Sequence, residues 1–478
     1  MSFTREINRL LIGLLVLFAG VAITAAYWSI VGADTILQRE DNPRRVEAER
    51  AIQRGDLVDR DGVVLAETIS GDNGVLRSYP YPATYGALGY YSYRYGASGI
   101  EAASNALLSG ADLERSPADA LVDGLLHRVR IGSDARLTLD LDVQTAVAEA
   151  LAGRSGAVVV IGVPDGNVLA LVSLPTYDPN TLDANWDQLV AAPGNPFFNR
   201  VIQGRYQPGG ALETPLIAAA MLTDIPLDTL VSTAPITLED LELSCAVRLP
   251  QIELTLREAY AFACPGAFST LIDPLGARTL EAVFDTFRLN DLPLISGYDA
   301  PAAAPSLTPT VPPAPVRITA DNALETALGQ GRLTVTPLSM ALMAAGIVND
   351  GNAPQPYLLL QTRAPNGEWV DAWTPRPSLP ITTTNTARRL QDLMRSAVAF
   401  GAAQNAGRPG IDIGGHAAVA YSGEGSLVWF VGFATFGGEQ GAAVAVIVED
   451  SADPGLAADI GGTALAAAQA AVTAGGSR

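Results

Sequence analysis

Two short segments of this chain contain the residues that we weigh for nucleophilic or acid–base chemistry. The first is YQPGGALETP, Tyr206 to Pro215, in which Thr214 stands beside Glu213. A hydroxyl next to a carboxylate could act as a nucleophile with its own base. The second segment carries His416 and Ser422, and His416 could exchange a proton with Glu213 across a cleft.

Each of these residues also has a structural role that the sequence favours. Thr214 followed by Pro215 predicts the N-cap and the first residue of a helix. Gly210 to Glu213 would then form a turn before that helix. Ser422 is typical of a hairpin turn, and a Glu–His pair is more often a plain ion pair than a catalytic pair. The sequence therefore argues against a newly evolved hydrolase or transferase site.

Length, composition and charge limit the class of protein. The chain has 478 residues, of which 48% are hydrophobic, so it is long enough for more than one domain and apolar enough for a large core. Its formal net charge is −20. A surface of this sign repels phosphate backbones, so we predict no binding to nucleic acid.

The segment Leu10 to Ala33 has no charged residue and is long enough to cross a hydrocarbon core of about 30 Å as a helix. The apolar part of a cleaved signal peptide is shorter, about 7–15 residues, so we expect an uncleaved signal anchor. Arg5 and Arg9 precede the segment and Asp34 follows it. The positive-inside rule therefore places residues 1–9 in the cytoplasm and the rest of the chain outside.

Cysteine and histidine usage indicates no metal site and no cofactor. The chain has two His and two Cys, and these are not spaced as metal ligands are. Cys245 and Cys264 fall in the part predicted to lie outside the membrane, where disulfides persist. A bridge between them and two separate buried thiols both remain open, because the sequence gives no geometry.

Beyond the anchor, the sequence pattern changes near residue 136. Residues 34–135 contain a predicted hairpin around the turn Asp59 to Gly62 and a stretch rich in Tyr, Pro and Gly, which indicates a compact non-catalytic module. Residues 136–478 begin with a strand and a helix and are predicted to form the second domain. Within it, residues at about 300–316 contain Pro too often for a helix or a central strand, so we expect an exposed loop.

The second domain is predicted to be α+β. Gly156 to Pro175 has two β-branched runs joined by a Pro-Asp-Gly turn, which predicts a hairpin. Two more apolar runs, SLVWFVGFA and GAAVAVIVED, stand near the end, and several helical segments lie between. We therefore expect an antiparallel sheet with helices packed against it.

From end to end the chain resembles a class B penicillin-binding protein. The segments that carry the resemblance are RGDLVDRDGVVLA, YGASGIEAASNALLSG, LTLDLDVQTAVAEAL, GAVVVIGVPDGNVLALVSLPTYDPN, NRVIQGRYQPGG and LGQGRLTVTPLSMALMAAGIVNDG. The resemblance implies one transmembrane helix, a pedestal or dimerisation-like domain, and a transpeptidase domain of the penicillin-binding protein and serine β-lactamase type.

The chemistry of this family needs three motifs that meet in one cleft: S-x-x-K, S-x-N and K-T-G. The Ser attacks a carbonyl, and the Lys one helical turn away takes its proton. The Lys and Thr of the third motif bind the terminal carboxylate of the donor peptide, which penicillin mimics.

When the first two motifs are aligned with this sequence, the reactive residues of both motifs are absent. The first places Gly210 at the nucleophile and Glu213 at the base. The second places Ala263 for the Ser and Pro265 for the Asn. The resemblance therefore implies a cleft without the Ser nucleophile and without the Lys base.

The third motif is also absent. It places His416 for Lys, Ala417 for Thr and Ala418 for Gly, and a register one residue earlier gives Gly415, His416 and Ala417. An ionised Glu213 would repel an anionic donor, and a mostly neutral His would not replace the charge of Lys. We therefore expect even non-covalent penicillin binding to weaken.

All three motifs lack their catalytic residues, although the residues that flank them still match the family. This pattern predicts a membrane-anchored pseudoenzyme that acts as a scaffold or regulator in cell-wall synthesis or division. Its expected partners are membrane proteins of the cell envelope, such as those of the division or elongation machinery. Two alternatives stay open. One is an active or penicillin-binding transpeptidase with an unorthodox site, and the other is a non-catalytic module that binds peptidoglycan.

Overall fold

The computed structural model describes residues 3–27, 52–71, 74–113, 129–249, 253–298, 316–423 and 425–475. The predicted loop at 300–316 lies outside these residues, apart from Val316. The chain divides into two compact units, and the larger one consists of Arg54–Ile69, Arg77–Glu114 and Ile131–Arg478. The smaller unit contains the N-terminal helix.

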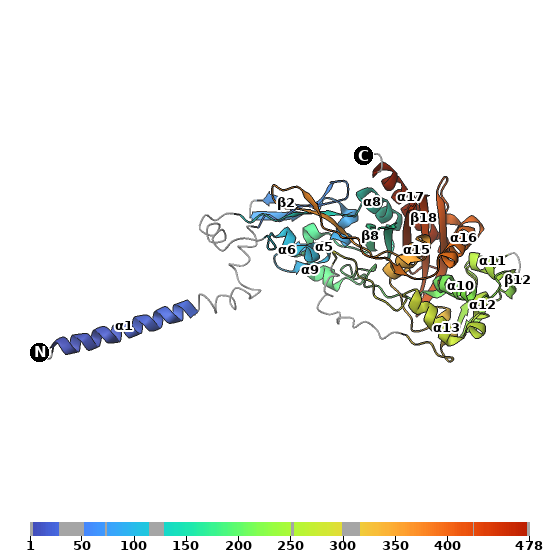
Figure 1. The fold of residues 1–478 in the computed structure, drawn as a ribbon, viewed down its shortest axis with the longest axis horizontal. Helices are drawn as coiled ribbons and strands as arrows, with labels where there is room; N and C mark the ends of the chain where they lie inside the picture. Colours follow the sequence, from blue (N-terminus) through green and yellow to red (C-terminus); the bar gives the residue numbers. More distant parts are fainter. Residues whose placement is uncertain are drawn as a thin grey trace. The chain divides into compact units, whose positions relative to one another are not determined.

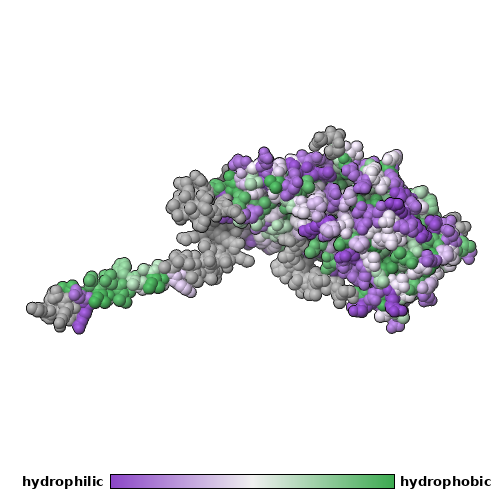
Figure 2. Space-filling view, in the orientation of Figure 1, coloured by the Kyte–Doolittle hydropathy of each residue, from purple (hydrophilic) through white to green (hydrophobic). Residues whose placement is uncertain are grey.

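The N-terminal helix α1, Phe3–Tyr27, carries apolar side chains along most of its length (Figures 1 and 2). Its segment Ile7–Ala25 has a mean hydropathy of 2.1 and is 0% buried. A helix of this length and composition can cross a bilayer. The predicted span Leu10 to Ala33 therefore coincides with α1 as far as Tyr27, and residues 28–33 lie outside the described part.

Five antiparallel strands form the central sheet of the larger unit, in the order β17-β18-β19-β7-β8 (Figure 1). They are β7 (Gly156–Val163), β8 (Val168–Leu174), β17 (Asp412–Ser422), β18 (Gly425–Gly437) and β19 (Gln440–Glu449). β7 and β8 make the predicted hairpin, and the two apolar runs near the C-terminus make another, β18 with β19. The prediction of an α+β fold with an antiparallel sheet is confirmed.

Helices cover both faces of this sheet because its inner strands are apolar on both sides. All residues of β7 are buried. Along it, Val158 and Val160 belong to one hydrophobic cluster, whereas Val159 and Ile161 belong to another, as the two-residue period of a strand requires. On the first face pack α8 (Leu141–Leu151) and α17 (Pro454–Gly475), and on the second packs α15 (Pro337–Val348).

The C-terminal helix α17 resembles a membrane span in composition, since Pro454–Ala474 has a mean hydropathy of 1.2. Unlike α1, this segment is 44% buried, because it packs against the sheet and α8. We therefore describe α17 as a core helix. Among the described residues, the hydrophobic clusters begin at Leu57, so none of these clusters includes a residue of α1.

A second sheet has the strand order β15-β14-β6-β1-β2-β3. Its strands are β1 (Leu57–Val58), β2 (Val64–Gly71), β3 (Gly74–Ser78), β6 (Asp134–Leu137), β14 (Leu359–Arg363) and β15 (Trp369–Asp371). β1 and β2 form the predicted hairpin, and Asp59 Oδ1 fixes its turn by accepting hydrogen bonds from the N–H groups of Asp61 and Val63. This sheet takes strands from both sides of residue 136, and the domain division there stays a prediction.

Shorter elements complete the larger unit. The helices are η2 (Pro82–Thr84), α4 (Tyr85–Leu88), α5 (Gly99–Ala103), α6 (Asn105–Leu108), η3 (Pro179–Thr181), α9 (Leu182–Ala191), α13 (Ile272–Thr286), α14 (Ala323–Ala327), α16 (Thr384–Phe400) and η5 (Gln404–Ala406). The strands are β4 (Tyr91–Ser92), β5 (Gly96–Ala97), β9 (Leu230–Ser232), β10 (Ile236–Leu238), β11 (Leu241–Leu243), β12 (Glu253–Thr255), β13 (Asn352–Ala353) and β16 (Leu379–Pro380).

A buried charge network joins α5 to the segments that flank the β1–β2 hairpin. Glu101 Oε2 accepts a hydrogen bond from Arg54 Nη2 at 2.8 Å, and Glu101 Oε1 accepts one from Arg77 Nε at 2.7 Å. Arg54 also donates to Asn105 Oδ1, and Arg77 donates to the carbonyl of Gly55. Burial acts to raise the pKa of Glu101, but the two guanidinium groups outweigh it, so this pKa lies below its ordinary value. Glu101 is therefore an ionised acid inside the core.

Candidate active site

The first candidate segment begins a buried helix. Gly209–Leu212 forms a 3-10 turn, η4, and the α-helix α10 runs from Glu213 to Leu222. The prediction that Thr214 is the N-cap is wrong, because Thr214 lies inside the first turn and its hydroxyl shares a hydrogen bond with Tyr260 OH at 2.9 Å. Pro215 is tolerated there because N–H groups of a first turn have no partner within the helix.

The second candidate segment joins two helices. α11, Leu256–Ala261, begins with a capping box between Thr255 and Glu258. Ala263 then takes a positive φ of 48°, which turns the chain before α12, Pro265–Ser269. Ala263 and Pro265 thus stand at a tight corner between the helices.

The two cysteines, whose pairing the sequence left open, form a disulfide in the structure. Their Cα atoms are 4.0 Å apart. Cys264 is the residue between Ala263 and Pro265, and Cys245 belongs to the loop after β11. The bond therefore ties that loop to the corner between α11 and α12, and the backbone N–H of Ala246 strengthens the tie by donating to the carbonyl of Ala263 at 3.0 Å.

The third candidate segment lies on β17. His416 and Ala418 share one face of this strand because side chains alternate along it. His416 Nε2 is 3.1 Å from the carbonyl oxygen of Gly210 and donates to it, since a carbonyl only accepts. Ala418 lies next to the same glycine, because a Cβ built on Gly210 would be 3.0 Å from Ala418 Cβ.

The three segments meet around one small cavity of about 150 Å³. Four of the residues carried over from the family motifs line it, Gly210, Ala263, Pro265 and Ala418. The segment 243–246, Gln330 and Tyr421 also contribute to its wall. Ala417 does not line this cavity, and neither do Glu213 and His416. The exposed Ser422, at the end of β17, is also outside it.

Glu213 and His416 contact each other behind Gly210. Glu213 is 2% exposed and His416 is 1% exposed, and His416 Nε2 is 3.5 Å from Glu213 Oε2. Neither carboxyl oxygen of Glu213 has a hydrogen-bond partner among the described residues, and the same is true of His416 Nδ1. The two side chains considered as a pair from the sequence are therefore in contact. They are almost fully buried, and no hydrogen bond joins them.

Burial sets the protonation of this pair. It raises the pKa of Glu213 well above its ordinary value, because no donor compensates the lost hydration of the carboxylate. Burial also lowers the pKa of His416 to about 4, against a small opposing effect of the bond to Gly210. Burial therefore favours the neutral form of both side chains, which weakens the plain ion pair that the sequence favours for a Glu–His contact.

Tyr260 closes the space around His416 and was not singled out from the sequence. Its ring stacks on the imidazole with centroids 4.4 Å apart and planes at 15°, and it is fully buried. Burial raises the pKa of its hydroxyl, which bonds to Thr214. The only sequence signal is its position one helical turn after Leu256 in an apolar helix, which indicates burial and nothing more.

The arrangement offers no activated nucleophile. Gly210 has no side chain, the Thr214 hydroxyl is bonded to Tyr260, and Glu213 and His416 do not line the cavity. Among the described residues, no group of three or more His, Cys, Asp or Glu side chains is arranged to hold a metal ion. The cavity is a small polar hollow with a methyl group, Ala418, beside the position of the nucleophile.

Comparisons with protein families match two regions of the chain. Residues 156–471 match the penicillin binding protein transpeptidase domain. Residues 54–132 match the penicillin binding protein A dimerisation domain. Both matches fall in the part that follows the apolar N-terminal helix.

Similar proteins cover almost the whole chain. A peptidoglycan D,D-transpeptidase PbpA from Mycolicibacterium smegmatis is 30% identical over 97% of this chain and 98% of its own length. Among solved structures, an imipenem acyl-enzyme complex of penicillin-binding protein A from M. tuberculosis has a TM-score of 0.75 and 29% identity, covering 88% of this chain and 99% of that one. A D,D-transpeptidase domain from Eggerthella lenta has a TM-score of 0.73 and 27% identity, covering 88% and 99%.

Proposed function

Since the chain belongs to the penicillin-binding protein transpeptidase family, we propose that it is a catalytically inactive member that acts as a scaffold or regulator in cell-wall synthesis or division. One observation carries the proposal. The residue at the nucleophile position, Gly210, sits in the cleft beside Ala418, whose methyl group stands 3.0 Å from where a Cβ at 210 would lie. The cleft is therefore packed for a residue without a side chain.

Electrostatics support the same proposal. The transpeptidase chemistry of this family needs a base next to the nucleophile and a cation for the donor carboxylate. At the corresponding positions burial raises the pKa of Glu213, which favours its protonated form, and lowers the pKa of His416 to about 4, which favours its neutral form. Neither group supplies a positive charge at pH 7, so an anionic donor or a penicillin gains nothing from them.

The proposal is tested by exposing the full-length chain in detergent to a fluorescent penicillin and measuring the intact mass. Penicillin-binding protein A from M. tuberculosis, which forms acyl-enzyme complexes, is the positive control. We expect no adduct on this chain under conditions that label the control fully. An adduct of β-lactam mass would overturn the proposal and would favour a transpeptidase with an unorthodox site, whose nucleophile peptide mapping would identify.

A non-catalytic peptidoglycan-binding module is the second candidate, because the cavity of about 150 Å³ keeps polar wall residues such as Ser244, Gln330 and Tyr421. The cavity is smaller than the roughly 300–1,000 Å³ of ordinary small-molecule pockets, so we rank it below the scaffold. Titration with a muropeptide that carries a D-Ala-D-Ala stem separates the two. Saturable binding that is lost in Ala418→Phe would favour the module.

We also propose that α1 is an uncleaved membrane anchor with residues 1–9 in the cytoplasm and the later domains outside. Arg5 and Arg9 before the apolar segment support this orientation. Its expected partners are membrane proteins of the cell envelope. Protease added outside intact cells should remove a C-terminal tag and spare an N-terminal tag, and the reverse pattern would contradict the orientation.

A further inference from the structure

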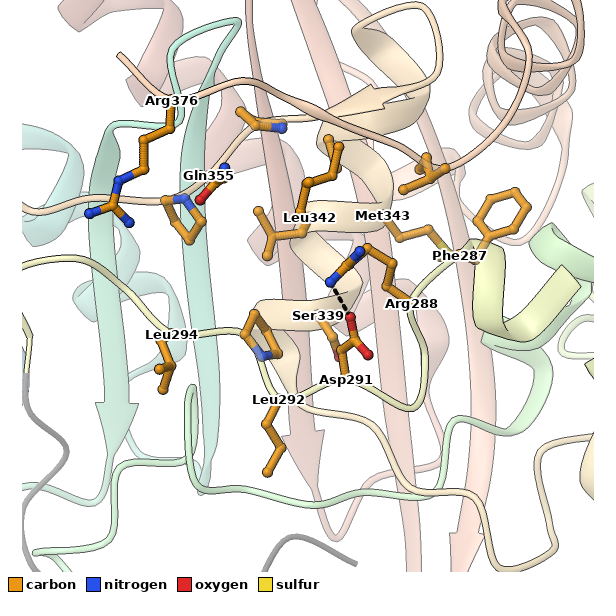
Figure 3. A pocket seen from close by; sticks show the side chains of 16 residues that line it. Phe287, Arg288, Asp291, Leu292, Leu294, Ser339, Leu342, Met343, Gln355 and Arg376 are labelled. Carbon is orange, nitrogen blue, oxygen red and sulfur yellow. Dashed lines mark ion pairs between the residues drawn. The ribbon is translucent and has the colours of Figure 1, made fainter. Parts of the chain in front are cut away.

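A second cavity lies apart from the candidate active site, where the end of α13, one face of α15 and the β13–β16 pair come together (Figure 3). Its volume is about 550 Å³, within the range of pockets that hold small organic ligands, roughly 300–1,000 Å³. It shares no lining residue with the smaller cavity around Gly210. Any function it has is therefore independent of the proposed inactivity.

Apolar side chains form slightly more than half of the wall of this cavity, and polar groups form the rest. Leu342 and Met343 project into it from α15, and Ile381 lines it from the segment after β16. At its edge, Leu292 is 37% exposed and Leu294 is 81% exposed. Apolar side chains left in water at the mouth of an apolar cavity favour a ligand with a hydrophobic body.

The charges at the cavity are unevenly distributed. Arg288 Nη2 pairs with Asp291 Oδ2 at 2.5 Å, so these two charges cancel. In the view of Figure 3, Arg376 and Gln355 lie on the opposite side of Leu342 from this pair. Arg376 is exposed and has no ion-pair partner among the described residues. The cavity therefore has one uncompensated positive charge at its mouth.

Two hydrogen bonds show which polar groups hold the wall in place and which already have a partner within the protein. Gln355 Nε2 donates to the carbonyl of Pro377 at 2.9 Å, which holds the segment that carries Arg376 beside the cavity. The hydroxyl of Ser339, another wall residue, donates to the carbonyl of Thr336 at 2.7 Å. Ser339 is therefore occupied, and Arg376 is the group left to recognise a charged ligand.

We propose that this cavity binds a monoanionic amphiphile, with its hydrophobic body against Leu342 and Met343 and its carboxylate or sulfonate at Arg376. A guanidinium group fits a carboxylate with two parallel hydrogen bonds. The chain as a whole carries a net charge of −20, which disfavours anions. The local positive charge of Arg376 has to outweigh this repulsion, and it does so most effectively at short range, at the mouth of the cavity. A cationic amphiphile would be repelled by Arg376 and would find no unpaired acid among the wall residues.

The test uses decanoate as the probe and decylammonium as its cationic counterpart. Both are titrated by calorimetry into the chain from residue 34 onward, which keeps all described core clusters. We expect saturable binding of decanoate with one site per chain and at least about ten-fold weaker binding of decylammonium. Absent saturation, or equal binding of the two probes, would overturn the proposal.

Two variants and a matched control locate the site. Leu342→Trp fills the cavity and should abolish decanoate binding, while Arg376→Gln should weaken it about five-fold, the effect of losing one exposed ion pair. Arg389→Gln, an exposed arginine of α16 that does not line the cavity, should leave it unchanged. If the melting temperature shows that Leu342→Trp is misfolded, Leu292→Glu replaces it and should repel the anion. Equal affinities of Arg376→Gln and Arg389→Gln would place the probe elsewhere and reject the site.

Discussion

Two glutamates, both almost completely buried, behave in opposite ways. Glu101 lies between Arg54 and Arg77, accepts hydrogen bonds on both oxygens, and has a lowered pKa. Glu213 faces His416 without a hydrogen-bond partner among the described residues and has a raised pKa. The same side chain is therefore stabilised as an anion in the region around α5, whereas burial favours its neutral form at the start of α10.

The difference shows what a buried carboxylate needs in order to stay ionised. Two guanidinium groups at hydrogen-bond distance offset the lost hydration of Glu101, whereas a single imidazole at 3.5 Å does not do so for Glu213. Glu213 thus lacks the partners that would favour its charged form, whereas Glu101 has two of them.

Removing the charge of Glu101 should have the largest effect. Glu101→Gln leaves Arg54 and Arg77 as buried cations without a counterion, and we expect a loss of about 3–5 kcal/mol in the free energy of unfolding at pH 7. Urea denaturation of the chain from residue 34 onward measures it. The control is Asp350→Asn, which breaks the exposed pair with Arg388 and should cost about 1 kcal/mol or less. Similar losses in both variants would contradict the structural role of the network.

Glu213→Gln should raise the free energy of unfolding above pH 4.5, whereas Glu101→Gln should lower it. Because the folded pKa of Glu213 lies above the unfolded value of 4.5, the wild-type chain loses about 1.4 kcal/mol of stability per pH unit as pH rises from 4.5 toward the folded pKa. Gln cannot ionise, so the variant and the wild type should match below pH 4.5 and diverge above it, with the variant more stable. A variant less stable than wild type at pH 8 would mean that Glu213 is ionised and partnered.

The ionisation of His416 should change the free energy of unfolding on the acid side of the same pH profile. Its folded pKa of about 4 lies below the unfolded value of 6.5, so its contribution is present above pH 6.5 and is lost as pH falls toward 4, on the order of 3 kcal/mol. In the wild type, Glu213 and His416 act in opposite directions between pH 4.5 and 6.5. The Glu213→Gln variant should therefore show a rise over this interval that the wild type lacks. A flat profile in the variant would show that the imidazole is not held neutral.

The smallest effect concerns packing between Gly210 and Ala418. Gly210→Ser places a Cβ 3.0 Å from Ala418 Cβ, and we expect a cost of about 1–3 kcal/mol from overpacking. Ala418→Gly should relieve part of it, so the double variant should be more stable than the sum of the single changes predicts. A double-mutant cycle of urea midpoints measures this coupling. Additive changes would show that the methyl group does not occupy the space of the missing side chain.

Local patterns in the sequence were sufficient for much of the fold. The hairpins β1–β2 and β7–β8 follow from alternating apolar residues around Asp and Gly turns, and these signals lie within a few residues of each other. The prediction that Thr214 is the N-cap of α10 is wrong because the Thr214 hydroxyl bonds to Tyr260, which is distant in the sequence. A capping signal of this kind is overridden by tertiary contacts that no local pattern contains.

The candidate site depended on the family resemblance. It placed Gly210, Ala263, Pro265 and Ala418, and these residues do line one cavity. Neither the stacking of Tyr260 on His416 nor the neutral state of Glu213 followed from it, because both come from burial by several elements. The cavity at Arg376 gave no sequence signal at all, since its wall is assembled from separate segments.

The contact between Gly210 and Ala418 bears on any attempt to engineer catalysis into this chain. Under the proposed function, the Ala418 methyl group lies where the side chain of a nucleophile at position 210 would need room. A serine introduced alone is expected to lower stability before any activity appears. The base and the carboxylate-binding cation would also have to be supplied, each without benefit by itself. Removal of one methyl group is therefore the first step of any such design.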